Sequence, residues 1–140
     1  MSDADTRIEH DSLGDVAVPA DAYWGAQTQR ALGLFAIGDT RFPASLIRAL
    51  ATIKHAAATA NCTLDVIAPR VADLIRAAAD DVALGALDEH FPLRIWISGS
   101  GTQLNMNVNE VIANRANEAA GNSRGSNSPA HPNDHVNATQ

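Results

Sequence analysis

The sequence predicts a mainly α-helical fold: one domain over residues 1–140, with several helices and a small β-hairpin near the amino terminus. Three segments, beginning near residues 44, 69 and 102, repeat apolar residues at the spacing of a helix face. Aromatic residues make up only 4% of the chain while alanine is abundant, which suits closely packed helices better than a β-sandwich. With 140 residues and 46% hydrophobic side chains, the chain is long enough for one compact core.

Short extended pieces precede the first helix. Residues 1–6 are polar and are expected to be disordered. Residues 8–11 and 16–18 have strand character, and Gly14-Asp15 is the expected turn of a hairpin between them. A helix is expected over residues 22–34.

Two helical segments in the middle of the chain are predicted to form an antiparallel pair with a short connection. The second starts at Pro69, because proline is favoured in the first turn of a helix. In the first, Lys54 and His55 fall off the apolar stripe, which predicts surface positions for both. The stripe of the first segment comprises Leu46, Leu50, Ile53, Ala57 and Ala60, and that of the second Val71, Leu74, Ile75, Ala78 and Val82.

A glycine-rich turn then leads from a predicted strand at 93–97 into the third helical segment. Gly99 and Gly101 allow backbone conformations that are closed to other residues. Ser100 and Thr102 place hydroxyl groups at the start of the helix, where free amides and the helix dipole attract anions. The residues therefore indicate a site for a carboxylate or another small anion; an ordinary helix cap is the alternative.

Asparagine is unusually frequent in this third segment. Because its amide competes with the backbone for hydrogen bonds, asparagine is a poor helix former. The helix is expected to pack through one apolar stripe and to present an amide-rich stripe to a site, formed by Asn105, Asn107, Asn109 and Asn114.

Composition excludes several classes of protein. The net charge of −6 and the lack of a basic stripe argue against a nucleic-acid partner. No apolar run approaches the ~20 residues that cross a bilayer. The single cysteine, Cys62, excludes an internal disulfide and fits a reducing compartment. No secretory signal is visible, so a cytoplasmic protein is expected.

The last ten residues hold a second group of polar side chains. His131, Asp134 and His135 could be metal ligands, but their spacing matches structural zinc patterns poorly, so no metal is predicted. The glycine turn lacks the lysine of a phosphate-binding loop. Ser100 has no predictable base beside it, so it is read as a hydrogen-bond donor and not as a nucleophile.

Four stretches resemble one family. The segment Gly99-Ser-Gly-Thr-Gln-Leu-Asn-Met-Asn-Val-Asn-Glu-Val-Ile-Ala-Asn-Arg-Ala116 is similar to the first signature region of class II fumarases, in the fumarase/aspartase superfamily. The stretch His131-Pro-Asn-Asp-His-Val-Asn137 is similar to the segment that follows it there. The opening from Arg7-Ile-Glu through Pro19-Ala-Asp and the stretch Trp24-Gly-Ala-Gln-Thr-Gln-Arg30 are similar to the amino end of the family, so the resemblance covers nearly the whole chain.

The resemblance implies reversible hydration of fumarate to L-malate, without a metal or organic cofactor, by a homotetramer. The chain would be the amino-terminal domain, without the central helical bundle and the carboxy-terminal domain, and with none of the catalytic residues. By resemblance the carboxylate of the substrate is bound by Ser100, Gly101, Thr102 and Asn105. A secondary dicarboxylate site would comprise His131, Pro132, Asn133 and Asp134, although Ser128 stands where the family usually has an arginine.

Two alternatives stay open. One is an aspartate ammonia-lyase of the same superfamily, although Gln103 and the Trp24 stretch are more similar to fumarases. The other is a non-catalytic fragment that binds a dicarboxylate or has a structural role. As a separate molecule the 140-residue chain is expected to be inactive, because the proton-transfer groups of the family lie outside it.

Overall fold

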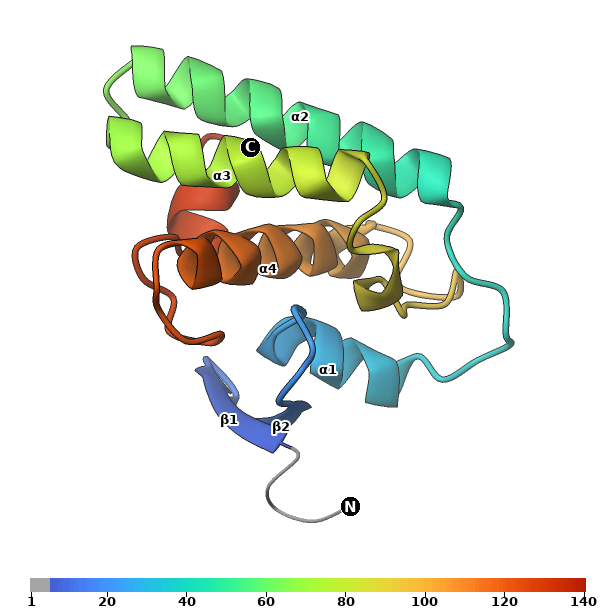
Figure 1. Ribbon diagram of the computed structural model, residues 1–140. Helices are drawn as coiled ribbons and strands as arrows, with labels where there is room; N and C mark the ends of the chain where they lie inside the picture. Colours follow the sequence, from blue (N-terminus) through green and yellow to red (C-terminus); the bar gives the residue numbers. More distant parts are fainter. Residues whose placement is uncertain (1–5) are drawn as a thin grey trace.

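The computed structural model describes residues 6–140 and confirms a mainly helical fold with an antiparallel hairpin (Figure 1). None of the helices described is long and apolar enough to cross a membrane. The regular elements are β1 Thr6–Asp11, β2 Gly14–Pro19, α1 Ala26–Leu34, α2 Ala44–Thr63, α3 Pro69–Ala83, α4 Thr102–Ala119, the short 3-10 helix η2 Asp88–His90 and the short π-helix η3 Pro132–Val136.

The hairpin forms where it was predicted, but its turn lies two residues earlier. Asp11 pairs with Gly14, so Ser12 and Leu13 make the turn, and the amide of Leu13 donates to Asp11 Oδ1. Gly14 follows at a φ of 104°, a conformation that glycine adopts readily. Thr6, expected to be disordered, is the first residue of β1; the rest of that prediction, residues 1–5, lies outside the described residues.

Helix α1 starts at Ala26, so the predicted start at residue 22 is wrong. The residues before it are not helical, and their backbone groups bond to side chains of other elements. Arg7 holds two of their carbonyl oxygens, since its guanidinium donates to Ala22 and Trp24 at 2.8 Å each. The helix can begin only after this segment, and carboxylates from elsewhere in the chain accept the first amides of α1.

Helices α2 and α3 form the predicted antiparallel pair, seen side by side in Figure 1. The apolar face of α3 is largely as expected, with Ile75, Ala78 and Val82 buried. On α2 the predicted face is wrong: Leu46 and Ile53 are 41% and 55% exposed. The helix instead buries Ile47, Ala51, Lys54, Ala58 and Asn61, so the predicted surface position of Lys54 is also wrong.

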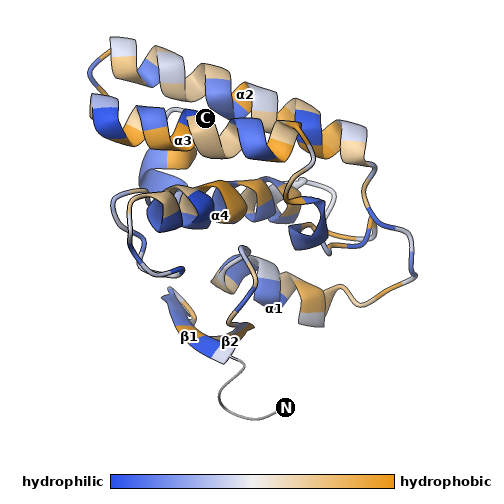
Figure 2. Ribbon diagram, viewed as in Figure 1, coloured by the Kyte–Doolittle hydropathy of each residue, from blue (hydrophilic) through white to orange (hydrophobic). Residues whose placement is uncertain are grey.

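Helix α4 lies between the α2–α3 pair and α1, and its middle is buried on all sides (Figure 1). Figure 2 shows hydrophilic residues along this central helix, which follows from its asparagines. Residues 93–97 do not form the predicted strand. Only one isolated bridge joins Arg94 to Arg41, and in the described chain no neighbouring strand is available to pair with the segment.

Candidate functional site

The start of α4 is an exposed cluster of hydroxyl groups on a glycine turn. Gly101 caps the helix at a φ of 74°, in the left-handed region that favours glycine. The Oγ of Ser100 lies 2.9 Å from that of Ser98 and 3.0 Å from the Oγ1 of Thr102. The structure therefore brings together three of the predicted carboxylate-binding residues at one helix end.

This helix end can accept an anion. In the described residues no side chain caps α4, and the amide of Thr102 makes only a long 3.4 Å contact with Ser100 Oγ. Free amides at the positive end of the helix dipole stabilise a carboxylate, and the hydroxyl groups add donors. Asn105, the fourth predicted residue, lies one turn further along and is half-buried, with its Nδ2 3.2 Å from Asn137 Oδ1.

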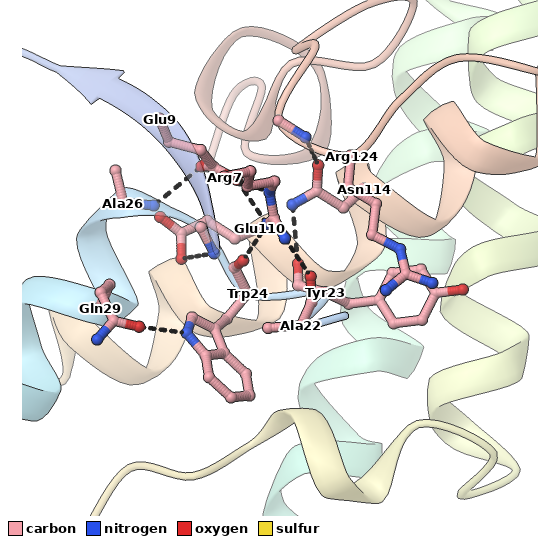
Figure 3. A network of polar contacts seen from close by, with 12 residues as sticks. Arg7, Glu9, Ala22, Tyr23, Trp24, Ala26, Gln29, Glu110, Asn114 and Arg124 are labelled. Atoms are coloured by element: carbon pink, nitrogen blue, oxygen red, sulfur yellow. Dashed lines mark hydrogen bonds and ion pairs between the residues drawn. The ribbon is translucent and has the colours of Figure 1, made fainter. Parts of the chain in front are cut away.

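The prediction that the amide-rich stripe is presented to a site is wrong for Asn107 and Asn109, whereas Asn105 lies near the start of α4 and Asn114 lines the cleft described below. Asn107, Asn109 and Asn114 are buried. The Nδ2 of Asn107 donates to the carbonyl of His90. The Nδ2 of Asn114 donates to the carbonyl of Tyr23, and Figure 3 shows this second contact. These side chains fasten loops to α4, because an amide can satisfy buried backbone groups that have no partner in a helix or sheet.

Sequence reasoning missed a buried carboxylate in the same helix. Glu110 is 4% exposed and accepts hydrogen bonds from the amides of Gly25, Gln27 and Thr28 at 2.9, 2.7 and 3.1 Å. Burial raises the pKa of Glu110 to about 6, against these bonds, which lower it. Figure 3 shows the carboxylate beside the start of α1, where the helix dipole favours a negative charge.

A second cleft lies between β1, α1, α4 and η3, with a volume of about 260 Å³. Of the predicted secondary-site residues, His131, Pro132 and Asn133 line it, whereas the side chain of Asp134 is 75% exposed. The Nδ1 of His131 accepts the amides of Asn133 and Asp134, both at 3.2 Å. These two amides are therefore already paired within the turn.

Three carboxylates line this cleft, and two of them are paired with arginines: Arg7 lies 2.6 Å from Glu9, and Arg30 lies 2.9 Å from Asp11. Glu9, Asp11 and Glu110 line its walls. Arg124, the arginine nearest to Ser128 in the sequence, lines a different groove, where it lies 3.9 Å over the ring of Tyr23 and pairs with Glu118. In residues 6–140 no three side chains of His, Cys, Asp or Glu gather closely enough to hold a metal ion.

Comparisons with known proteins agree with this architecture. A family model described as "Lyase" matches residues 14–140. A fumarate hydratase class II from Pseudomonas aeruginosa is 64% identical over 135 residues, which are 96% of this chain and 29% of that protein.

Two solved structures have the same fold. A fumarate lyase:delta crystallin from Brucella melitensis superposes with a TM-score of 0.93 at 47% identity, over 96% of this chain and 32% of that one. A class II fumarase from Schistosoma mansoni superposes with a TM-score of 0.90 at 46% identity, over 94% and 28%. The chain thus spans about a third or less of the length of these relatives. Because the family model covers most of its residues, the chain belongs to this lyase family, and its sequence corresponds to the amino-terminal region of class II fumarate hydratases.

Proposed function

We propose that the chain provides the carboxylate-binding part of a fumarate hydratase, which interconverts fumarate and L-malate. One observation carries this proposal: the uncapped start of α4, with its cluster of hydroxyl groups, in a chain 64% identical to a class II fumarate hydratase. The predicted homotetramer of the full-length enzyme is part of the same proposal.

The proposed role of each residue follows from its chemistry. Ser100 and Thr102 donate hydroxyl hydrogen bonds to one carboxylate of the substrate, Gly101 lets that carboxylate approach the backbone, and Asn105 lies one turn behind them. A hydration that passes through a carbanion develops negative charge on this carboxylate, which such donors stabilise. No residue of this chain is assigned a proton transfer, so the proposal includes inactivity of the separate 140-residue chain.

A secondary dicarboxylate site at His131, Pro132, Asn133 and Asp134 remains a prediction. The imidazole of His131 and the side-chain amide of Asn133, which line the cleft, support polar binding there. Against an anionic ligand stand the carboxylate of Glu110, which has no arginine beside it in the described residues, and the remote position of Arg124. We therefore expect this site to bind L-malate more weakly than the start of α4.

Calorimetric titration of the chain with L-malate tests the main proposal. We expect saturable binding, and a loss of about tenfold or more in affinity for Thr102→Val, since a hydrogen bond to a charged group contributes about 1.5–3 kcal/mol. Thr59→Val, the same change on the exposed face of α2, is the control and should bind as the unaltered chain does. Equal affinity of the unaltered chain and Thr102→Val would refute the proposed role of the start of α4.

Two further assays address the alternatives. L-Aspartate is titrated in the same way, and tighter binding of L-aspartate than of L-malate would favour the ammonia-lyase. Absorbance of fumarate is followed after L-malate is mixed with the chain alone. Turnover above a blank without protein would contradict the proposed inactivity.

A further inference from the structure

Lys54 is a charged side chain in the interior of the helical core. It lies on α2, is 2% exposed, and ranks among the largest fully buried side chains of the protein. Its Nζ donates one hydrogen bond in the described residues, to Asn137 Oδ1 at 2.9 Å. Across residues 6–140 no carboxylate oxygen lies within 4.0 Å of this nitrogen, so the ammonium group has no counter-ion in the core.

Such a group is costly to bury. An ammonium group removed from water without a paired charge loses most of its favourable solvation. Because of this loss of solvation, burial lowers the pKa of the Lys54 side chain to about 8. A methionine would fill nearly the same volume without this cost, so packing does not explain a lysine here.

The hydrogen-bond partner of Lys54 connects it to the candidate site. Asn137 Oδ1 also accepts a hydrogen bond from the Nδ2 of Asn105, at 3.2 Å. One oxygen therefore receives donors from α2 and from the first turns of α4. The cation fixes which way the Asn137 amide faces, because a reversed amide would point its NH₂ group at both donors.

We propose that Lys54 is a positioning residue for the dicarboxylate site at the start of α4, acting through Asn137 on Asn105. This inference rests on the function proposed above for that site. A cation behind the first turns of α4 also favours a dianion at the helix end, because charges interact more strongly in the poorly solvated interior than in water.

The chain offers a matched control for Lys54. Asn61 is also 2% exposed, lies two turns along α2, and joins the helix to the same terminal segment. Its Nδ2 donates to the carbonyl of Ala138 at 2.9 Å, and its Oδ1 accepts from Thr139 at 2.8 Å. Asn61→Ala therefore loosens the same segment without touching the contact between Asn137 and Asn105.

The experiment combines two readouts on the 140-residue chain and three variants, Lys54→Met, Lys54→Gln and Asn61→Ala. The first readout is the NMR signal of the Asn105 side-chain amide in the absence of ligand, and the second is the affinity for L-malate. We expect Lys54→Met to shift that signal and to weaken binding about tenfold, the effect of one lost charge-assisted contact. Asn61→Ala should leave the position of the Asn105 signal unchanged and the affinity for L-malate within about twofold of that of the unaltered chain.

Lys54→Gln decides the matter if Lys54→Met does not fold, since it removes the charge but retains a donor. We expect the affinity of Lys54→Gln for L-malate to lie between that of the unaltered chain and that expected for Lys54→Met. An unchanged Asn105 signal in the lysine variants, or an equal loss of affinity in Asn61→Ala, would overturn the inference. If the unaltered chain does not bind L-malate, the proposed function is wrong, and the Asn105 signal alone still decides whether Lys54 holds this side chain in place.

Discussion

The carboxylate of Glu110 should determine whether α1 stays attached to the rest of the molecule. The change to test is Glu110→Gln, which retains the shape of the side chain but leaves only one acceptor oxygen. In the structure Oε2 accepts from Gly25 N, Thr28 N and Thr28 Oγ1, and Oε1 accepts from Gln27 N. The best placement of the glutamine oxygen keeps three of these bonds and turns an NH₂ group toward the amide of Gln27.

The magnitude follows from these contacts. Losing the bond from Gln27 lowers the free energy of unfolding by about 1.5–3 kcal/mol, and the two donors left facing each other lower it by about 1–3 kcal/mol more. The pKa of the Glu110 carboxyl is raised to about 6, so its charge is unfavourable in the folded chain. Removing that charge raises the free energy of unfolding by roughly 2 kcal/mol at neutral pH. We therefore expect Glu110→Gln to lower the free energy of unfolding by about 2 kcal/mol, a large fraction of the ~5–15 kcal/mol of a typical domain.

Urea denaturation followed by circular dichroism measures this loss, and amide hydrogen exchange at Gln27 and Thr28 localises it to α1. The control is Glu89→Gln, the same change at an exposed position of η2, which should alter stability by less than ~0.5 kcal/mol. A loss below ~0.5 kcal/mol in Glu110→Gln, with unchanged exchange at the start of α1, would refute the reasoning.

Two other predictions concern buried polar groups. Because the pKa of Lys54 is about 8 in the folded chain and its ordinary value is 10.5, the unfolded chain binds more protons between these values, and the free energy of unfolding should rise by about 2 kcal/mol from pH 8 to pH 10. Urea denaturation at several pH values checks this, and a rise that persisted in Lys54→Met would contradict it. Asn117→Ala should cost about 2–4 kcal/mol, because the Asn117 amide pairs with both the N–H and the C=O of Ala130 in the core. Urea denaturation should show a much smaller loss of the free energy of unfolding for Asn122→Ala, whose side chain is exposed. Equal losses in the two variants would contradict the structural role given to the Asn117 amide.

Sequence periodicity located the helices but not always their buried faces. Helix α3 has one apolar stripe, and that stripe is buried. Helix α2 is apolar around most of its circumference, so Leu46 and Ile53 look as suitable for a core as Ile47 and Ala51. The buried face is the one that packs on α3 and that reaches Asn137 and Ala138, about 80 residues away, and no local pattern contains that information.

The candidate site divides in the same way. The glycine turn and the hydroxyl groups at Ser100 and Thr102 could be predicted because they depend only on adjacent residues. The contacts of the buried asparagines could not be predicted. An asparagine within a helix indicates a polar contact, but the sequence does not show which group is its partner. Asn114 bonds to the carbonyl of Tyr23, 91 residues before it, and Glu110 to the amide of Gly25, 85 residues before it.

These long sequence separations have a consequence for how the molecule folds. Helices α2 and α3 meet across a short connection, so their pairing closes a small loop and can form early. The contacts between α1 and α4 join residues more than 80 positions apart, so their formation closes a much longer loop. We expect α1 and the hairpin to attach last and to open first in native-state hydrogen exchange, well before α3 and α4 exchange.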